Sequence, residues 1–156
     1  MSAEVGAKAP QVRPVDAERN VVSVPAAGEI TVLVFFPAAF TSVCQAELCS
    51  FRDAIAAFND VSAKVYGISV DPPFTLAEFA KRNGLNFPLL SDFKHEAIRA
   101  YGIEFPNLAD IEGYTVARRS VFVIGKDGNV AWSWLAESPA NEPDYAAVKS
   151  AVAAAK

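Results

Sequence analysis

The sequence predicts an α/β protein built around one mixed sheet with helices on both faces. Three observations predict it: apolar strand-like runs alternate with segments of helical periodicity, a hairpin pattern follows them, and the chain shows no internal repeat or low-complexity linker. A chain of 156 residues can bury roughly 68–70% of the surface of its unfolded state. We therefore expect a single domain over residues 1–156.

The expected elements follow from apolar periodicity and from turn residues. In chain order they are a hairpin of strands over 12–15 and 20–24, a strand over 30–36, a helix over 41–58, a strand over 64–70, a helix over 75–83, a strand over 87–90, a helix over 93–101, a hairpin of strands over 120–124 and 129–135, and an alanine-rich helix that begins near 141 or 143. Thr41 and Thr75 are the expected N-caps of the first two helices, and Gly84 and Gly102 the expected ends of the second and third. Residues 102–117 form the one long irregular stretch, and such loops often border functional sites.

The composition is that of an ordinary folded protein, with 52% hydrophobic residues, 21% charged residues and a formal net charge of −4. Basic residues form no cluster beyond Arg118 and Arg119, which argues against nucleic acid as a partner. The first ten residues lack the apolar core of a secretion signal, and no apolar stretch approaches the ~20 residues needed to cross a bilayer. We therefore expect a cytoplasmic protein that does not bind membranes.

The sequence contains two cysteines, Cys44 and Cys49, and one histidine. In a reducing compartment these cysteines are expected to be reactive or simply packed, not permanently crosslinked. A structural zinc site usually takes four Cys or His ligands, so we expect no metal, and the sequence indicates no other cofactor.

Cys44 falls in the first turn of the helix expected over 41–58. Unpaired N–H groups and the positive end of the helix dipole favour an anion there, so a thiol in this place ionises more readily. An apolar stripe also runs along this helix, formed by Cys44, Leu48, Phe51, Ile55 and Phe58. From the residues alone, a reactive thiolate and a small core residue are both open readings of Cys44.

Cys49 lies about 140° round the helix from Cys44, on a more polar face with Gln45, Arg52 and Asp53. In an intact helix the two Cα atoms are roughly 8.7 Å apart, beyond the ~7 Å limit for a disulfide. A Cys44–Cys49 disulfide therefore requires the first turns to unwind and is expected only as a transient species. An unremarkable surface thiol is the alternative for Cys49.

Pro37, Thr41 and Cys44 form the pattern Pro-x-x-x-Thr-x-x-Cys, which resembles the active-site pattern of the peroxiredoxins. The chain is similar over most of its length to that family, and particularly to the one-cysteine alkyl hydroperoxide reductase E group. The resemblance implies a thioredoxin-like fold and a thiol-dependent peroxidase that reduces hydrogen peroxide, organic hydroperoxides or both. In this chemistry a thiolate attacks the outer peroxide oxygen, becomes a sulfenic acid and releases water or an alcohol. The segments most similar to the reductase E group are 36–48, 68–73 and 87–93.

The same resemblance implies roles for three residues at the start of the helix. Cys44 would be the nucleophile, and its backbone N–H would help to hold the peroxide oxygens. The Thr41 hydroxyl would orient the peroxide and the sulfur, and Pro37 would shield the thiolate from water.

The family also places an arginine three residues before a phenylalanine of a later strand. That spacing from Phe122 selects Arg119, which would stabilise both the thiolate and the negative charge on the leaving oxygen. Arg118 would point to the opposite side of a strand. Glu47 matches the reductase E pattern, and the resemblance suggests that it orients Arg119. From the residues alone, a solvated helix glutamate is the favoured interpretation of Glu47.

Cys49 departs from the reductase E pattern, which lacks a cysteine at this place. The related bacterioferritin comigratory proteins often have one there, five residues after the peroxidatic cysteine, as the resolving thiol. Two routes are therefore open: Cys49 condenses with the sulfenic acid of Cys44 and a thioredoxin-like protein reduces the disulfide, or an external low-molecular-weight thiol or redoxin attacks Cys44 directly. Analogy with the family also implies a homodimer.

Two other functions belong to different classes. A thioredoxin-type thiol–disulfide oxidoreductase shares the fold, but such proteins have Cys-x-x-Cys at the helix start, whereas the spacing here is Cys-x-x-x-x-Cys. A non-enzymatic interaction protein is the third hypothesis, for which the sequence offers only apolar surface candidates.

Overall fold

A six-stranded mixed sheet forms the centre of the protein, with the strands in the order β1-β4-β3-β2-β7-β8. The structure is a computed structural model that describes residues 3–59 and 63–155. Strands β2, β3 and β4 run parallel to one another, and β7 pairs antiparallel with β2, so the sheet is mixed as expected. The strands of this sheet are β1 (Val15–Asp16), β2 (Ile30–Phe35), β3 (Ala63–Ser69), β4 (Leu89–Ser91), β7 (Ser120–Ile124) and β8 (Val130–Leu135).

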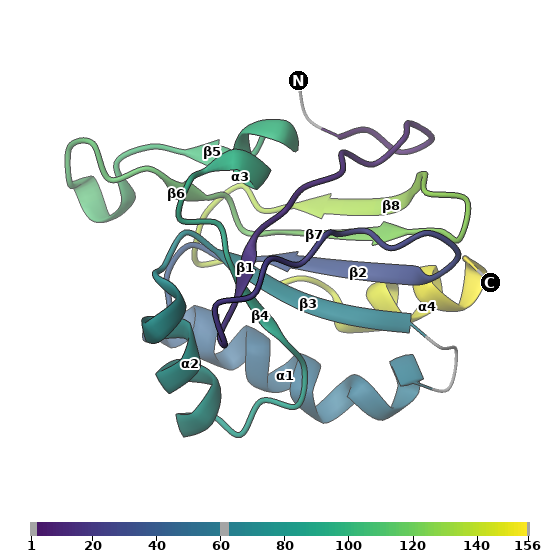
Figure 1. Ribbon diagram of the computed structural model, residues 1–156, viewed down its shortest axis with the longest axis horizontal. Helices are drawn as coiled ribbons and strands as arrows, with labels where there is room; N and C mark the ends of the chain where they lie inside the picture. The colour runs from purple at the N-terminus through teal and green to yellow at the C-terminus, as the bar shows by residue number, and fades with distance from the viewer. Residues whose placement is uncertain (1–2, 60–62, 156) are drawn as a thin grey trace.

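Helices cover both faces of the sheet (Figure 1). Three lie on one face: α1 (Ser42–Asn59), α2 (Pro73–Arg82) and α4 (Tyr145–Ala154). The short helix α3 (Glu96–Ala100) packs on the other face with the N-terminal segment. A small second sheet of β5 (Glu104–Phe105) and β6 (Val116–Ala117) lies at one end of the molecule, with the 3₁₀ helix η1 (Leu108–Asp110) in the loop between them.

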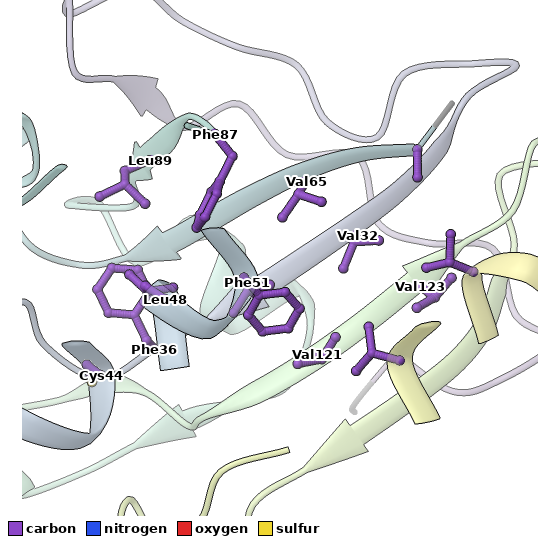
Figure 2. Packing of buried hydrophobic residues seen from close by; sticks show 14 of the residues in the cluster. Val32, Phe36, Cys44, Leu48, Phe51, Val65, Phe87, Leu89, Val121 and Val123 are labelled. Atoms are coloured by element: carbon purple, nitrogen blue, oxygen red, sulfur yellow. The ribbon is translucent and has the colours of Figure 1, made fainter. Parts of the chain in front are cut away.

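Strand β2 is buried along its whole length and supplies side chains to both faces because successive residues alternate in direction. Val32 and Val34 face the cluster under α1, α2 and α4, whereas Leu33 and Phe35 face the cluster under α3. Figure 2 shows the first cluster, with Cys44 at one end of it, beyond Phe36 and Leu48. The apolar stripe expected on α1 is therefore buried at Cys44, Leu48 and Phe51, while the side chains of Ile55 and Phe58 lie outside the described residues.

Several element boundaries differ from the sequence prediction for local reasons. Helix α2 begins at Pro73, two residues before the expected N-terminus, because proline is well suited to the first helical turn, and Thr75 is not its N-cap. Helix α3 begins only at Glu96, since His95 has φ 62° and cannot continue a right-handed helix. Helix α4 begins at Tyr145, where the Asp144 carboxylate accepts hydrogen bonds from two backbone N–H groups.

Of the two hairpins predicted from the sequence, one is present and the other is not fully formed. Strands β7 and β8 form the expected hairpin. The predicted N-terminal hairpin is reduced to two isolated antiparallel bridges, between Val12 and Val24 and between Val15 and Val21, and β1 pairs instead with β4. The stretch over residues 102–117 is not wholly irregular, because it contains β5, η1 and β6.

Candidate active site

Cys44 is the third residue of α1, which follows β2 through a tight loop over residues 36–41. The helix begins after Thr41, whose carbonyl accepts the first helical hydrogen bond from Gln45 N at 3.0 Å. The Thr41 hydroxyl donates to Ala38 O at 2.9 Å and thereby closes the loop on itself. Phe40, just before it, has φ 67°, so the chain reverses direction within the loop. The predicted place of Cys44 in the first helical turn is confirmed.

The loop is also tied to the end of β3. Asp71 Oδ2 accepts hydrogen bonds from Ala39 N at 2.8 Å and from Ser69 Oγ at 2.7 Å. A carboxylate that accepts from two donors fixes the loop backbone relative to the sheet. Asp71 therefore holds the residues before Cys44 in place, although the sequence marked it only as the end of a strand.

Arg119 lies between β6 and β7 and is 2% exposed. Each of its three nitrogens donates one hydrogen bond: Nη2 to Cys44 Sγ at 3.0 Å, Nη1 to Glu47 Oε1 at 2.9 Å, and Nε to Pro139 O at 3.0 Å. The planar guanidinium is thus fixed from three sides, with one donor aimed at the sulfur. Burial alone lowers the pKa of Arg119, but nearby Glu47 and Cys44 more than offset this and raise that pKa above its usual value, so the side chain stays cationic.

Arg118, the neighbour of Arg119, points elsewhere, as the alternation of strand residues predicts. Its Nε donates to Ala136 O at 2.6 Å. Among the described residues, the hydrogen bond to Cys44 Sγ comes from Arg119 and none comes from Arg118. Of the two arginines, Arg119 is the one that donates a hydrogen bond to Cys44.

Glu47 lies one helical turn after Cys44 and is completely buried. Burial raises its pKa to about 8, and the Arg119 charge acts in the opposite direction. Its Oε2 has no hydrogen-bond partner among the residues that the structure describes. The reading of Glu47 as a solvated helix glutamate is wrong, because the side chain faces Arg119 inside the protein.

A surface hollow of about 230 Å³ opens over the start of α1. Pro37, Thr41 and Arg119, all predicted from the sequence, lie in its wall. The rest of the wall is mostly apolar and comes from separate parts of the chain: Ser42, Val43, Leu108, Pro139 and Ala140. Cys44 itself is buried with 0% exposure and is linked to this wall by its hydrogen bond from Arg119.

Cys49 faces a different element. Its side chain is half-buried, and Sγ lies 3.8 Å from Oδ1 of Asn83, the residue that ends α2. Arg52, one turn further along α1, donates from Nη1 to the carbonyl of the same Asn83. Both cysteines are free thiols in this structure, and they lie on different sides of α1 as expected.

Three contributions to the site were missed at the sequence level. Asp71 supports the loop, the carbonyl of Pro139 holds Arg119, and Leu108 lines the hollow. The irregular stretch over residues 102–117 was a usable signal for Leu108. Pro139 had none, because its carbonyl is a backbone group that any residue has.

The described residues contain neither a candidate metal site nor a candidate membrane span. Within residues 3–59 and 63–155, no group of three or more His, Cys, Asp or Glu side chains is placed to bind a metal ion. Over the same ranges, no helix has the length and apolar character that a bilayer span needs.

The fold and the buried Cys–Arg pair define a class, the thiol peroxidases with a thioredoxin-like fold. A model of the AhpC/TSA family matches residues 5–133, and the chain belongs to this family. Alkyl hydroperoxide reductase E of Mycobacterium tuberculosis is 38% identical over 133 residues, which is 83% of each protein. The crystal structure of peroxidoxin BcpB from M. tuberculosis has a TM-score of 0.84 at 27% identity and covers 99% of both chains. A peroxiredoxin-like protein from Aquifex aeolicus has a TM-score of 0.90 at 26% identity, over 100% of this chain and 90% of the other.

These findings confirm the peroxiredoxin resemblance and the thioredoxin-like fold expected from it. The protein is an oxidoreductase that reduces peroxides with a thiol.

Proposed function

We propose that Cys44 is the nucleophile of a peroxidase reaction and that Arg119 stabilises both its thiolate and the leaving oxygen. The distance of 3.0 Å between Arg119 Nη2 and Cys44 Sγ supports this assignment. A guanidinium hydrogen bond to sulfur favours the anionic form, and the thiolate is the nucleophilic form. The first turn of α1 adds backbone N–H groups on the same side.

In the proposed step the Cys44 thiolate attacks the terminal oxygen of a hydroperoxide. An S–O bond forms and the O–O bond breaks, so the sulfur is oxidised by two electrons and the peroxide is reduced. The remaining oxygen leaves as water or an alcohol after it takes up a proton. A donor fixed near that oxygen stabilises the charge that develops there, and Arg119 has both the charge and the fixed geometry for this role.

Thr41 and Pro37 would position the peroxide within the hollow. The proton of the Thr41 hydroxyl is used by Ala38 O, so its lone pairs remain available to accept from the terminal O–H of a peroxide. Pro37 is buried, has no N–H and offers no donor to water beside the sulfur. Because most of the wall is apolar, we propose that organic hydroperoxides are substrates as well as hydrogen peroxide.

We propose that Cys49 resolves the sulfenic acid of Cys44. In the folded helix the two Cα atoms are roughly 8.7 Å apart, so the first turns of α1 must unwind before a disulfide can form. Just before these turns, the ring of Phe40 packs on that of Phe79 of α2, with 5.1 Å between the centroids. The alternative is direct attack of an external thiol on Cys44.

Members of the family use thioredoxin-like reductants on peroxide substrates and are often dimers. For this chain we propose a thioredoxin-like protein or a low-molecular-weight thiol as the reductant, a homodimer as the assembly and the cytoplasm as the compartment. No metal or other cofactor enters the proposed steps.

Mass spectrometry after one equivalent of hydrogen peroxide tests both assignments. A loss of two hydrogens mapped to Cys44 and Cys49 supports internal resolution, whereas a stable gain of one oxygen on Cys44 supports the external route. Cys44→Ser is expected to abolish peroxide consumption while Cys49→Ser still consumes one equivalent. Unchanged consumption by Cys44→Ser contradicts the proposed function.

A further inference from the structure

Glu47 is a buried acid that the proposed chemistry uses only to hold Arg119. Arg119 provides one positive charge between two acidic groups, Cys44 at 3.0 Å and Glu47 at 2.9 Å. All three side chains are 2% exposed or less. An unpaired charge in such a place is strongly disfavoured because it has lost its hydration, so the three groups should carry no net charge.

Charge balance therefore allows only one of the two acids to be ionised at a time. If the sulfur is a thiolate, as nucleophilic attack requires, then Glu47 is the group that keeps its proton. The oxygens of Glu47 agree with this assignment, because Oε1 accepts from Arg119 and Oε2 has no partner in the described part of the chain. A neutral carboxyl tolerates one unpartnered oxygen far better than a carboxylate does. The raised pKa of Glu47, caused first by burial, points the same way.

Oxidation reverses the balance. A sulfenic acid is neutral, so Arg119 loses its anionic partner at sulfur and only Glu47 can replace it. We propose that Glu47 holds a proton while Cys44 is a thiolate and releases it when Cys44 becomes a sulfenic acid. The inference rests on the proposed peroxidase function and makes Glu47 a positioning residue that acts through Arg119.

The step balances without a proton from the medium. The Cys44 thiolate, the hydroperoxide and the Glu47 carboxylic acid become the sulfenic acid, the alcohol and the Glu47 carboxylate. The S–O bond forms and the O–O bond breaks; the departing oxygen takes up one proton and Glu47 gives one up. The net charge of the three groups is zero before and after.

Other titratable groups near Glu47 do not change this balance. Glu142, in the segment before α4, is exposed, and its charge raises the pKa of Glu47 further. Tyr145 of α4 donates to Glu142, and burial raises its own pKa, so it remains a neutral hydroxyl. Arg119 is the one cation that acts on Glu47 among these neighbours in the described residues.

Proton counting during a single turnover tests the proposal. In a Cys49→Ser background, which stops the cycle at the sulfenic acid, one equivalent of hydrogen peroxide is added in weak buffer at neutral pH with an indicator dye. We expect no net proton uptake by the Cys49→Ser protein. When Glu47→Gln is added to Cys49→Ser, we expect uptake of one proton per oxidised Cys44. Glu78→Gln is the matched control, since Glu78 is an exposed partner of Arg82, and it should behave like the Cys49→Ser parent.

Infrared difference spectroscopy supplies a second readout that does not depend on counting protons in solution. The stretch of a protonated carboxyl group should disappear when the Cys49→Ser protein is oxidised, and it should be absent from the Glu47→Gln difference spectrum. Over a pH series, the oxidation rate with Glu47 should fall as pH rises through the titration of that carboxyl, whereas the rate of Glu47→Gln should not.

Uptake of one proton by the parent, or a carboxyl band that is absent or unchanged on oxidation, overturns the inference while leaving the peroxidase assignment intact. No oxidation of Cys44 at all overturns the proposed function instead.

Discussion

The two cysteines lie five residues apart on the same helix, yet they have very different neighbours because they face different sides of α1. Cys44 is buried and receives a charge-assisted hydrogen bond at 3.0 Å from a guanidinium that is itself fixed on three sides. Cys49 is half-buried and meets a neutral amide oxygen at 3.8 Å on the flank of α2. The difference teaches that neighbouring side chains can make two thiols of one helix chemically distinct, and the different roles that we propose for them rest on this.

The largest expected effect tests the cation on the Cys44 side. Arg119→Met removes the donor to sulfur and should slow the oxidation of Cys44 by about 10²–10³-fold, the usual loss when one fixed donor to a developing charge is removed. Stopped-flow fluorescence or competition with a reference peroxidase measures this rate. Arg118→Met is the matched control, because Arg118 donates to Ala136 O instead, and its rate should stay within about twofold of the parent. Equal losses in the two variants would remove the distinction drawn between them.

The next largest effect is expected from a substitution of Thr41, also on the Cys44 side of α1. Thr41→Val keeps the shape of the side chain but removes the hydroxyl that closes the loop onto Ala38 O, and it should slow oxidation by roughly 10–100-fold. Thr41→Ser restores the hydroxyl and should recover most of the rate. If valine and serine behave alike, the hydroxyl has no part in the reaction.

The apolar wall over Cys44 should select among peroxides. Leu108→Ala removes three carbon atoms from the wall of the hollow, and we expect about a tenfold lower rate with an alkyl hydroperoxide such as cumene hydroperoxide. The rate with hydrogen peroxide should change little, since that molecule makes few apolar contacts. Ile111→Ala, on an exposed residue of the same segment that is not part of the wall, is the control. Equal losses with both peroxides would mean that Leu108 supports the loop and does not contact the substrate.

On the Cys49 side of α1 we expect a substitution to increase a rate, not to decrease it. Asn83→Ala removes the contact to Cys49 Sγ and the hydrogen bond of Asn83 Nδ2 to Phe79 O at 2.9 Å. Loss of about 1 kcal/mol from the folded arrangement should make the unwound form more accessible and accelerate disulfide formation by about fivefold. Quenched-flow alkylation with mass spectrometry measures this rate. Asn129→Ala, in the turn between β7 and β8, should have no effect. Slower disulfide formation in Asn83→Ala would show that Asn83 assists resolution.

The last expected effect is on the stability of the protein and not on a rate. The pKa of Glu47 is raised to about 8 in the folded protein, above its ordinary value of 4.5, so between these values the unfolded chain binds fewer protons than the folded one. The free energy of unfolding should therefore decrease as pH rises through this range, and Glu47→Gln should remove that decrease. Urea denaturation of the reduced proteins at a series of pH values measures the difference. The difference in free energy of unfolding between the parent and Glu78→Gln should not change with pH over this range, because the hydrogen bond from Arg82 lowers the pKa of Glu78.

The sequence was a reliable guide to several features that depend on local pattern, although the N-terminal hairpin and the Thr75 N-cap were not among them. The apolar run of β2 and the turn residues after it placed Cys44 in the first turn of α1, and residue alternation separated Arg119 from Arg118. It was less reliable at element ends, where one backbone angle at His95 shortened α3. It also favoured a solvated side chain for Glu47, which is buried, since nothing in a single helix shows which neighbour will cover a face.

By itself, the sequence determined the helix start with its thiol, the alternation of strands and helices, and the separation of two sulfurs around one helix. These features depend on periods of two and 3.6 residues and on capping, which act over a few neighbouring residues. Only the tertiary structure decided that Glu47 and Cys44 would meet the guanidinium of Arg119, from which they are 72 and 75 positions apart in the chain. It also decided that Leu108 would line the hollow beside them. Contacts at such separations are set by how the sheet and helices pack as a whole, and no local pattern encodes that packing.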